Sequence, residues 1–518
     1  MAKIKLTLSE GHNPNYVASI CRVGELHPIE NSDRLARAVI DGYDVVVQNT
    51  MSPDDIVVYV PVESVICDKY LRANNDYEIS EWQKNSNAAE VGELLNKGDE
   101  ESRALAKSKV GFFGKNGRVR PIRLRGVASI GYISPVSSIE KMDPSTVGTK
   151  WEDFVGTSFD EVNGEKFCWK FIPQVNEPTP RGDGSKNKKM QKRVNRFKRI
   201  IPGTYLLHYD TQHLNKNMHN FNPDDIITIS VKVHGSLGEF ANILVNRKLT
   251  FMEKVKKFFG FKVAETEYGN IYSSHHQIKN EYLNPGAEHF YGFDVWGAVN
   301  EVFSPYLDKG MTVYGEIVGY CPGSETMIQK RHDYGCEVGQ WKFMPYRITS
   351  AQADGSKFEW NLTEVDAWTH KLVDEHPELS DKVLFLTILY HGRFGDLYPD
   401  IDTKNHWHEN VLERMKNDKT LLLMEELEPM CHLYEKEHLA AIENYEKAKS
   451  DGASKKILKQ LEDEVEKYFN LRAPREGVVI RKDNDPLAEA WKLKTNAHAI
   501  RVAGRQHDAG EVDMEETA

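Results

Sequence analysis

The chain has 518 residues, of which 40% are apolar, 28% charged and 10% aromatic, a globular composition with room for about two to four domains. Its 67 basic residues are outnumbered by 78 acidic ones, so the net charge of −11 excludes a polycation that coats nucleic acid but leaves room for a local basic patch. No apolar run is long enough to cross a membrane, and the first residues lack the apolar stretch of a secretory signal. Six cysteines without a CxxC pair indicate reduced thiols of a cytosolic protein, not a zinc site or a disulfide framework.

The first 165 residues have the pattern of short β-strands separated by turns. Between Leu35 and Val47, two β-rich runs meet at Asp41-Gly42, the pair that a type I′ hairpin turn prefers because both central residues need a positive φ. A third run follows, and another begins at Arg120. Strands this short and this regularly interrupted predict a small β-barrel.

Residues 166–224 are expected to form a linker followed by a basic helix. The stretch 174–185 is rich in proline, glycine and polar residues, as linkers are. From Lys186 to Arg199 there are eight basic residues and no acidic ones, and apolar residues recur at helical spacing. This helix could present a solvated face or contact a phosphate backbone, and the localised charge in an acidic chain favours the phosphate contact.

Beyond residue 225, β-rich segments return with helical pieces between them, which predicts an α+β domain over 225–518. Residues 351–470 differ from both flanks and predict a helical insertion. Near its end we expect two strongly charged helices, at about 432–449 and 454–470, that are separated at Asp451-Gly452 and form a hairpin packed at the surface.

Three short strings place charged residues at the ends of predicted strands. In KVHGS, Lys232 ends an apolar β-run just before Gly235. Partial desolvation there can lower the pKa of a lysine and free its amine for attack, and glycine lets a phosphate approach the backbone. Glu316 ends the strand of VYGEIVGY, and Glu476 opens that of EGVVIR. Taken singly, each of these residues is most often structural or salt-bridged.

A fourth string, KLK, places Lys492 and Lys494 two residues apart, so on a strand both side chains face the same way. Two ammonium groups on one face repel each other unless an anion lies between them. This pair is therefore the best single indication of a phosphate site.

In this order, the four strings resemble motifs I, III, IV and V of the nucleotidyltransferase superfamily of ATP-dependent ligases and capping enzymes. The string ETMIQKRHDYGCEVGQWKFMPYRI resembles the segment leading into motif IIIa of RNA ligases. VASICRVGELHPIENSDRLARAVIDGYDVVV and RPIRLRGVASIGYISP resemble the N-terminal OB domain of the Deinococcus- and Naegleria-type RNA ligases. The resemblance covers roughly 14–165, 200–350 and 470–497, and leaves out most of 351–470.

The resemblance implies an ATP-dependent RNA ligase of α+β class, with an OB-type β-barrel over 1–165 and a nucleotidyltransferase domain of antiparallel sheets and helices over 225–518. Lys232 matches the nucleophile that attacks the α-phosphorus of ATP and forms a lysyl–AMP phosphoramide. The AMP then passes to a 5′-phosphate, and a 3′-OH displaces it to seal the strand. Lys492 and Lys494 are implied to hold the phosphates and stabilise the charge that develops during transfer.

Oxygen ligands and an aromatic ring complete the implied site. Glu316 and Glu476 are suited to Mg²⁺ or Mn²⁺, and the resemblance also places Glu316 on the adenosine ribose. Tyr346 is expected to stack on adenine, with Phe343 as the second choice. The residues implied to bind ATP are Val233, His234, Gly235, Glu316, Phe343, Tyr346, Glu476, Lys492 and Lys494.

Two departures from the resemblance bear on the class of ligase. DNA ligases usually carry aspartate where His234 stands, and a histidine there is more similar to one class of phage RNA ligases; it removes a carboxylate near the metal, which leaves the number of metal ions open. Only 24 residues follow Lys494, too few for the OB domain that capping enzymes and most DNA ligases carry after motif V. An N-terminal OB domain therefore favours an RNA ligase that grips the 3′-OH strand.

The implied partner is a nicked RNA or RNA/DNA duplex. We expect a monomer without membrane contact in the cytoplasm, which would be the host cytoplasm if the gene is phage-encoded. The residues assigned to nucleic-acid binding are Arg120, Arg123, Arg125, Lys192, Arg193 and Arg196. The three arginines of the β-rich run could line an OB groove, or they could equally be ordinary surface residues.

Two alternatives stay open. A non-catalytic nucleic-acid-binding protein would explain the OB-type strings, although the complete set of charged residues argues against it. A DNA ligase or a GTP-using capping enzyme would keep the chemistry and change the substrate.

Overall fold

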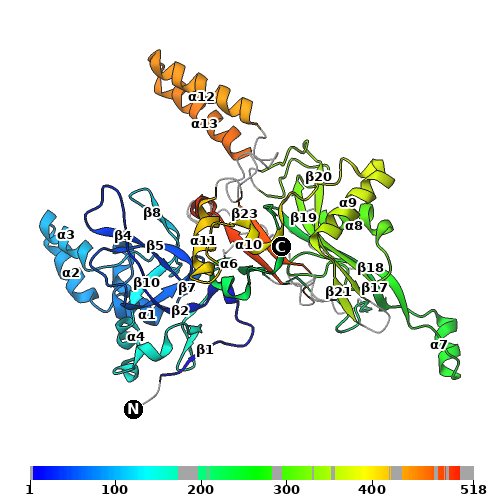
Figure 1. Cartoon of the computed structure of the whole chain (residues 1–518), viewed down its shortest axis with the longest axis horizontal. Helices are drawn as coiled ribbons and strands as arrows, with labels where there is room; N and C mark the ends of the chain where they lie inside the picture. Colours follow the sequence, from blue (N-terminus) through cyan, green and yellow to red (C-terminus); the bar gives the residue numbers. More distant parts are fainter. Residues whose placement is uncertain are drawn as a thin grey trace, which may run out of the picture. The chain divides into compact units, whose positions relative to one another are not determined.

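A computed structural model describes residues 4–172, 197–205, 207–208, 210–282, 294–329, 332–351, 356–418, 421, 434–471, 476–483, 485 and 489–501 (Figure 1). The chain divides into two compact units: unit 1 holds Met1–Pro173, Gln212–Asn220 and Lys494–Glu511, and unit 2 holds Gln174–Thr211, Phe221–Leu493 and Val512–Ala518. The predicted linker 174–185 and most of the predicted basic helix, with Lys192, Arg193 and Arg196, lie outside the described residues. Within the described ranges, no helix is long and apolar enough to cross a membrane.

Unit 1 is built from short antiparallel strands with small helices between them. Its strands are β1 (Leu6–Thr7), β2 (Ala18–Arg22), β3 (His27–Pro28), β4 (Leu35–Ile40), β5 (Tyr43–Gln48), β6 (Ile56–Val60), β7 (Ser64–Ile66), β8 (Ile122–Leu124), β9 (Val127–Ser129), β10 (Tyr132–Pro135), β11 (Ser158–Phe159), β12 (Glu161–Val162), β13 (Glu165–Lys166), β14 (Cys168–Lys170) and β15 (Gln212–His213). Its helices are α1 (Asp68–Asn74), α2 (Ala88–Lys97), α3 (Glu100–Ser108), α4 (Ser137–Met142), α6 (Leu214–Asn217) and α14 (Asn496–Arg501). The largest sheet has the order β10-β6-β2-β11, and β3, β4 and β5 form a meander.

The predicted hairpin at Asp41-Gly42 is confirmed. β4 pairs with β5 so that Ile40 lies opposite Tyr43, and the two residues between them have φ values of 53° and 80°, as a type I′ turn requires. Gly42 also lies against the backbone of Asn215, whose carbonyl oxygen would be 2.2 Å from a Cβ at this position. Both the turn and this close approach therefore require glycine.

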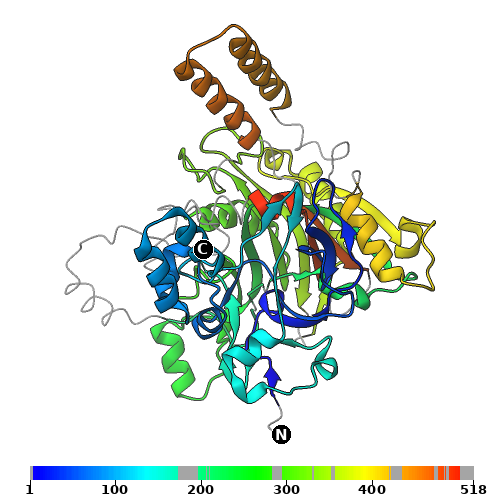
Figure 2. The same cartoon turned by 90° about the vertical axis from the view of Figure 1, so that its left-hand side faces the viewer.

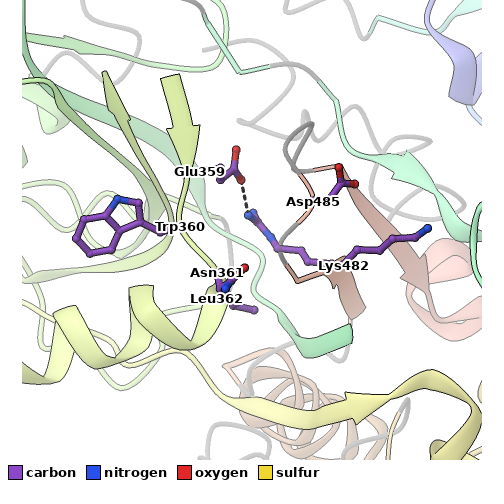
Figure 3. Close-up of a pocket in the computed structure, with 7 residues that line it drawn as sticks. Glu359, Trp360, Asn361, Leu362, Lys482 and Asp485 are labelled. Carbon is purple, nitrogen blue, oxygen red and sulfur yellow. Dashed lines mark hydrogen bonds and ion pairs between the residues drawn. The ribbon is translucent and has the colours of Figure 1, made fainter. Parts of the chain in front are cut away.

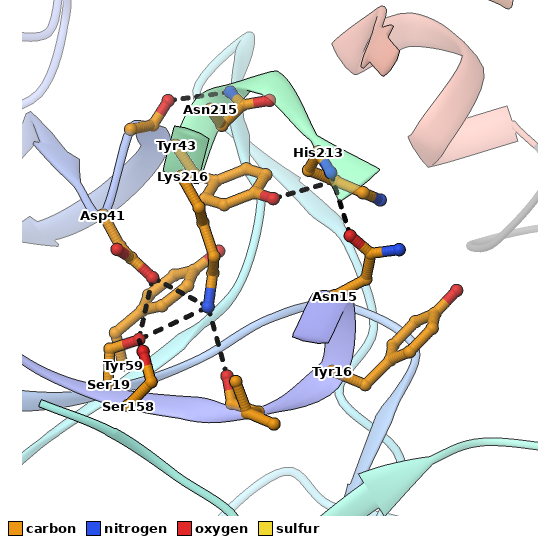
Figure 4. A network of polar contacts seen from close by, with 12 residues as sticks. Asn15, Tyr16, Ser19, Asp41, Tyr43, Tyr59, Ser158, His213, Asn215 and Lys216 are labelled. Atoms are coloured by element: carbon orange, nitrogen blue, oxygen red, sulfur yellow. Dashed lines mark hydrogen bonds and ion pairs between the residues drawn. The ribbon is translucent and has the colours of Figure 1, made fainter. Parts of the chain in front are cut away.

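A polar network ties the returning segment 212–220 to the strands of unit 1 (Figure 4). The ammonium of Lys216 lies 2.9 Å from Asp41 and donates to the carbonyl of Val17 and the hydroxyl of Ser19. The phenol of Tyr43 lies 2.8 Å from Nδ1 of His213. These contacts explain why a segment distant in sequence belongs to this unit.

Unit 2 contains two antiparallel sheets. In the first, here called the β17 sheet, the order is β18 (Thr266–Ser273), β17 (Ser236–Asn246), β19 (Met311–Gly319), β20 (Trp341–Ala351) and β21 (Lys357–Glu359). In the second, the β16 sheet, β24 (Ala490–Lys494), β23 (Gly477–Lys482), β16 (Ile226–Lys232) and β22 (Ile388–Arg393) lie in that order. The helices of unit 2 are α7 (Phe251–Phe258), α8 (Val295–Phe303), α9 (Leu362–Glu375), α10 (Phe394–Leu397), α11 (Trp407–Asn417), α12 (Glu435–Ser450) and α13 (Lys455–Leu471).

One face of the β17 sheet is apolar, whereas the opposite face is mixed and includes a smaller apolar cluster with Ala241, Ile243 and Ile271. Phe240, Val313 and Phe343 point to the apolar face, where they pack in one buried cluster with residues of α8 and α9 such as Trp296 and Val365. Because successive side chains on a strand point to opposite faces, the intervening residues line the other face. That face carries the acidic and basic side chains of the site described below.

Residues 351–470, where we expected a helical insertion, contain both helices and strands. α12 and α13 lie side by side as the predicted hairpin, with Gly452 at a φ of 72° between them (Figures 1 and 2). β21 and β22, however, are integral strands, and β22 pairs directly with β16. The run ILYHGR is rich in residues that favour strands, and it completes the β16 sheet instead of interrupting it.

Candidate active site

Lys232 and Glu476 meet at the point where two strands pair. Ile227, Ile229 and Val231 of β16 are buried on one face, so alternation carries Lys232 to the other face at the strand end. The register of β16 on β23 sets Lys232 opposite Gly477, directly after Glu476.

The side chains of Lys232 and Glu476 are in contact and are largely excluded from solvent. The ammonium nitrogen of Lys232 lies 3.0 Å from Oε1 of Glu476, and the two side chains are 12% and 1% exposed. The other carboxylate oxygen, Oε2, lies 3.6 Å from Nδ1 of His234. Two residues far apart in sequence thus form one buried charge pair, with the imidazole beside it.

The loop after Lys232 is held by two side chains that sequence reasoning did not single out. The amide N–H of His234 donates to the phenol oxygen of Tyr334 at 2.9 Å, and Nε2 of Gln329 donates to the carbonyl of Gly235 at 2.7 Å. Both belong to the string that resembles the approach to motif IIIa, which was the available signal. They join that string to the loop of the candidate nucleophile.

Glu316 lies against the same loop. A Cβ at Gly235 would be 2.8 Å from the carbonyl oxygen of Ile317 and 3.0 Å from Oε2 of Glu316. Only glycine therefore allows the loop to approach β19 so closely. Glu316 itself is 6% exposed and lies opposite Met344 on β20. Lys232, Glu476 and Glu316 are thus gathered around residues 233–235.

The two lysines of β24 follow the same alternation. Trp491 and Leu493 are each 1% exposed, and the Trp491 ring packs edge-on against Phe221 with centroids 4.7 Å apart. Lys492 and Lys494 therefore point to the opposite face of the strand. Lys492 is buried, at 8% exposure.

The two aromatic candidates lie on different surfaces. Phe343 is 1% exposed and packs edge-on against Phe240 in the apolar cluster, so it is not brought to the face of Glu316. Tyr346 is half-buried, with its ring centroid 6.3 Å from that of His208 and 5.9 Å from the guanidinium carbon of Arg481. Tyr346 thus lies in a polar environment.

A bridge of two arginines on one glutamate joins the two sheets. Glu359 of β21 accepts from Arg481 of β23 and from Arg347 of β20, each at 2.8 Å. Figure 3 draws the first of these two contacts. Arg481 and Glu359 line a pocket with Lys482 and Asp485. Arg347 and Arg481 each belong to a string that carries the resemblance, but a single arginine within a β-run is an unspecific signal, and neither was predicted as a site residue.

A second buried carboxylate lies beside this bridge. Glu239 of β17 is fully buried and accepts from the amide N–H of His208, whose ring faces Arg347 at 3.1 Å. Burial raises the pKa of Glu239 to about 7, and the amide of His208 partly offsets that rise. Burial and, secondly, the charge of Arg347 hold the pKa of His208 well below its usual range.

The raised pKa of Glu239 makes stability depend on pH. Between about pH 4.5 and 7 the folded protein keeps a proton here that the unfolded chain releases, so the contribution of this group to stability falls as the pH rises. Glu239→Gln should therefore gain stability relative to the wild type across this window, by up to about 1.4 kcal/mol per pH unit. Denaturant titrations of both proteins at pH 5, 6, 7 and 8 measure the difference; a constant difference would contradict the assignment.

The donors of the site fit a hard divalent cation. Glu316 and Glu476 supply carboxylate oxygens in a buried setting, and such oxygens are the ligands that Mg²⁺ and Mn²⁺ prefer. A cation there would offset the cost of burying these charges.

The arginines expected on one strand of unit 1 are not all on it. β8 covers only Ile122–Leu124, so Arg120 precedes the strand and Arg125 occupies the turn after it, at a φ of 49°. Arg120 is half-buried and donates to the carbonyl of Phe112, whereas Arg123 and Arg125 are exposed.

No model of a protein family matches the chain, and no curated protein matches its sequence. Among solved structures, the chain is similar to those of a Naegleria gruberi RNA ligase. A variant with AMP and Mn is 15% identical, with a TM-score of 0.45 over 93% of this chain and 97% of that one. An apo variant is 15% identical, with a TM-score of 0.45 over 94% of this chain and 98% of that one. A variant with ATP and Mn is 14% identical, with a TM-score of 0.43 over 93% of this chain and 98% of that one.

Proposed function

We propose that this protein is an ATP-dependent RNA ligase that forms a covalent lysyl–AMP on Lys232 and seals 5′-phosphate/3′-OH nicks, with RNA on the 3′-OH side. The observation that carries the proposal is the buried pair of Lys232 and Glu476 at 3.0 Å, beside a loop packed against Glu316. A lysine and two carboxylates converge there from three separate strings whose order resembles the motifs of that superfamily.

In the first step the amine of Lys232 attacks the α-phosphorus of ATP. The N–P bond forms, the bond to the bridging oxygen breaks and pyrophosphate leaves; the nitrogen gives one proton to the carboxylate of Glu476, 3.0 Å away, before the attack and a second proton to solvent after it. An ammonium has no electron pair for this attack, and the ion pair with Glu476 stabilises the ammonium. Glu316 and Glu476 would hold a divalent cation, which would supply positive charge that neutralises the phosphates and weakens that ion pair.

The remaining basic residues have electrostatic roles. Lys492 and Lys494 stabilise the negative charge that builds on the phosphates during transfer. Arg347 and Arg481 share the single carboxylate of Glu359, so this group of three side chains carries excess positive charge. Arg481 lies on the same face of the β16 sheet as Lys232. Tyr346 is the proposed stacking partner of adenine because its ring lies in this polar environment.

In the later steps the AMP passes from Lys232 to a 5′-phosphate, and the 3′-OH attacks that phosphate and releases AMP. We assign the grip on the 3′-OH strand to unit 1, as an OB-type barrel built from its short antiparallel strands. Shape and 2′-OH contacts would distinguish an A-form strand there. Arg123 and Arg125, which are exposed, are available for such contacts.

A panel of nicked duplexes tests the proposal. The protein is incubated with Mg²⁺ or Mn²⁺ and each NTP, and its mass is measured before all-RNA, RNA/DNA-hybrid and all-DNA nicks are added. Among the NTPs, we expect only ATP to yield an adduct, of one AMP per chain. We also expect the protein to seal every nick whose 3′-OH strand is RNA. A GMP adduct would identify a capping-type enzyme, sealing of all-DNA nicks alone a DNA ligase, and no adduct with any NTP a non-catalytic binding protein.

A further inference from the structure

A short helix lies in the connection between two long antiparallel strands of unit 2. β17 ends at Asn246, β18 begins at Thr266, and α7 lies in the connection between them (Figure 1). The helix begins with a capping box in which Thr250 and Glu253 exchange hydrogen bonds, so its start is well defined. Residues 247–265 are called the α7 tip below.

The α7 tip exposes large apolar side chains. Those exposed by more than 60% are Phe251 (79%), Met252 (64%), Phe258 (85%), Phe259 (69%) and Phe261 (67%). Helical spacing sets Phe251 and Phe258 on one face of α7, so the rings form a patch and are not scattered singly. A contiguous apolar patch on a protein surface indicates a surface that meets a partner.

The same tip carries lysines that the described part of the chain does not pair. Arg247 is bound to Glu253 at 2.7 Å and Lys257 to Glu265. For the side chains of Lys248, Lys254, Lys256 and Lys262, no hydrogen bond or ion pair to a described residue is found. These four exposed cations next to exposed rings form a local basic surface that suits an anionic partner, in a chain that is acidic overall.

The base of the α7 tip is concave. A pocket of about 430 Å³ is lined by Phe197, Lys198, Arg247, Lys248, Lys254 and Glu265, among others. Lys198 and Arg247 are bound to Glu281 and Glu253, so the phosphate and the flat base of a nucleotide would meet Lys248, Lys254 and the ring of Phe197. A membrane surface presents a continuous plane of headgroups and gives no reason for such a pocket.

We propose that the α7 tip is a binding surface for unpaired RNA, in which bases stack on the exposed phenylalanines while phosphates meet the unpaired lysines and the pocket. Interleaved aromatic rings and cations are the general means of holding single strands without reading their sequence. The inference rests on the proposed function, because it identifies the part of the protein that would hold a flap or tail beside the nick.

Two double variants test the surface separately from catalysis. Lys254→Glu/Lys256→Glu reverses two of the unpaired charges, and Phe258→Ala/Phe259→Ala removes two of the rings. Lys455→Glu/Lys456→Glu on α13, where both lysines are also exposed, is the matched control. Affinity for a fluorescent oligouridylate is measured by anisotropy at several salt concentrations.

We expect each tip variant to bind the oligouridylate at least about tenfold more weakly, while the control variant binds like the wild type. The charge variant should also lower the slope of log K against log salt by about 1.4, which is 0.7 for each lost phosphate contact. Tip variants and control should all form the AMP adduct with ATP at the wild-type rate, and thermal melting should show that all are folded.

The outcomes separate the two proposals. Wild-type affinity for oligouridylate in both folded tip variants would overturn the RNA surface and leave the ligase assignment intact. Loss of binding to phosphatidylserine-containing vesicles without loss of RNA binding would replace RNA with a membrane as the partner. Absence of the AMP adduct in the wild type would overturn the ligase and leave the measured RNA binding of the tip as a property of its own.

Discussion

Lys232→Met is expected to abolish the AMP adduct. The rate of ATP-dependent sealing should then fall by a factor on the order of 10³ or more. The methionine has no amine to form the N–P bond, whereas its chain fills nearly the same volume beside Glu476. Intact-mass measurement after incubation with ATP and Mg²⁺ is the assay, with sealing of a nick that already carries a 5′-adenylate as the companion reaction. That companion reaction should persist in part, since it does not need the lysyl–AMP.

Lys482→Met is the matched control for this lysine. Lys482 also ends a strand of the β16 sheet, but its ammonium pairs with Asp225 at 3.0 Å, away from Glu476. The control should be adenylylated like the wild type. If Lys232→Met still carried AMP, the nucleophile would be a different residue and the assignment of the first string would be wrong.

Glu476→Gln is expected to lower both adenylylation and stability. The amide keeps the shape of the carboxylate but cannot accept a proton from Lys232 or bind a cation with the same strength, so adenylylation should fall about a hundredfold or more. Because Glu476 is 1% exposed, loss of its charge leaves a nearly buried ammonium uncompensated, which should cost about 3 kcal/mol of unfolding free energy.

The double variant Lys232→Met/Glu476→Gln separates the two effects. Without either charge, the pair no longer holds an uncompensated ammonium, and the double variant should be more stable than Glu476→Gln alone. Denaturant unfolding of the four proteins gives the coupling free energy. Strict additivity of the two single changes would mean that the ion pair contributes nothing to the fold.

Features that depend on a few neighbouring residues, such as turns and strand ends, were predicted correctly from the sequence. The turn at Asp41-Gly42 follows from two adjacent residues, and the break between α12 and α13 at Gly452 follows from one. Lys232 could be recognised because an apolar β-run ends there, which is again a feature of a few neighbouring residues.

Nonlocal features were the ones that sequence reasoning missed. β22 was assigned to a helical insertion because no residue within it indicates that it pairs with β16. Gln329 and Tyr334 form hydrogen bonds to a loop that is distant in sequence, and neither residue type by itself indicates that partner. Phe343 and Tyr346 were ranked without knowledge of the face of β20 that each one meets, and the pairing of Phe343 with Ile317 sets Phe343 on the apolar face.

The pairing of β16 with β23 has a consequence for the growing chain. Glu476 and Lys492 lie in the part of the described chain that leaves the ribosome last, and Lys232 meets Glu476 only after that part has been made. A nascent or prematurely terminated product would thus contain the nucleophile without its counter-charge and remain inert toward ATP. Under this proposal, covalent labelling by nucleotide would report that translation had run through β23 and that the polypeptide had closed on itself.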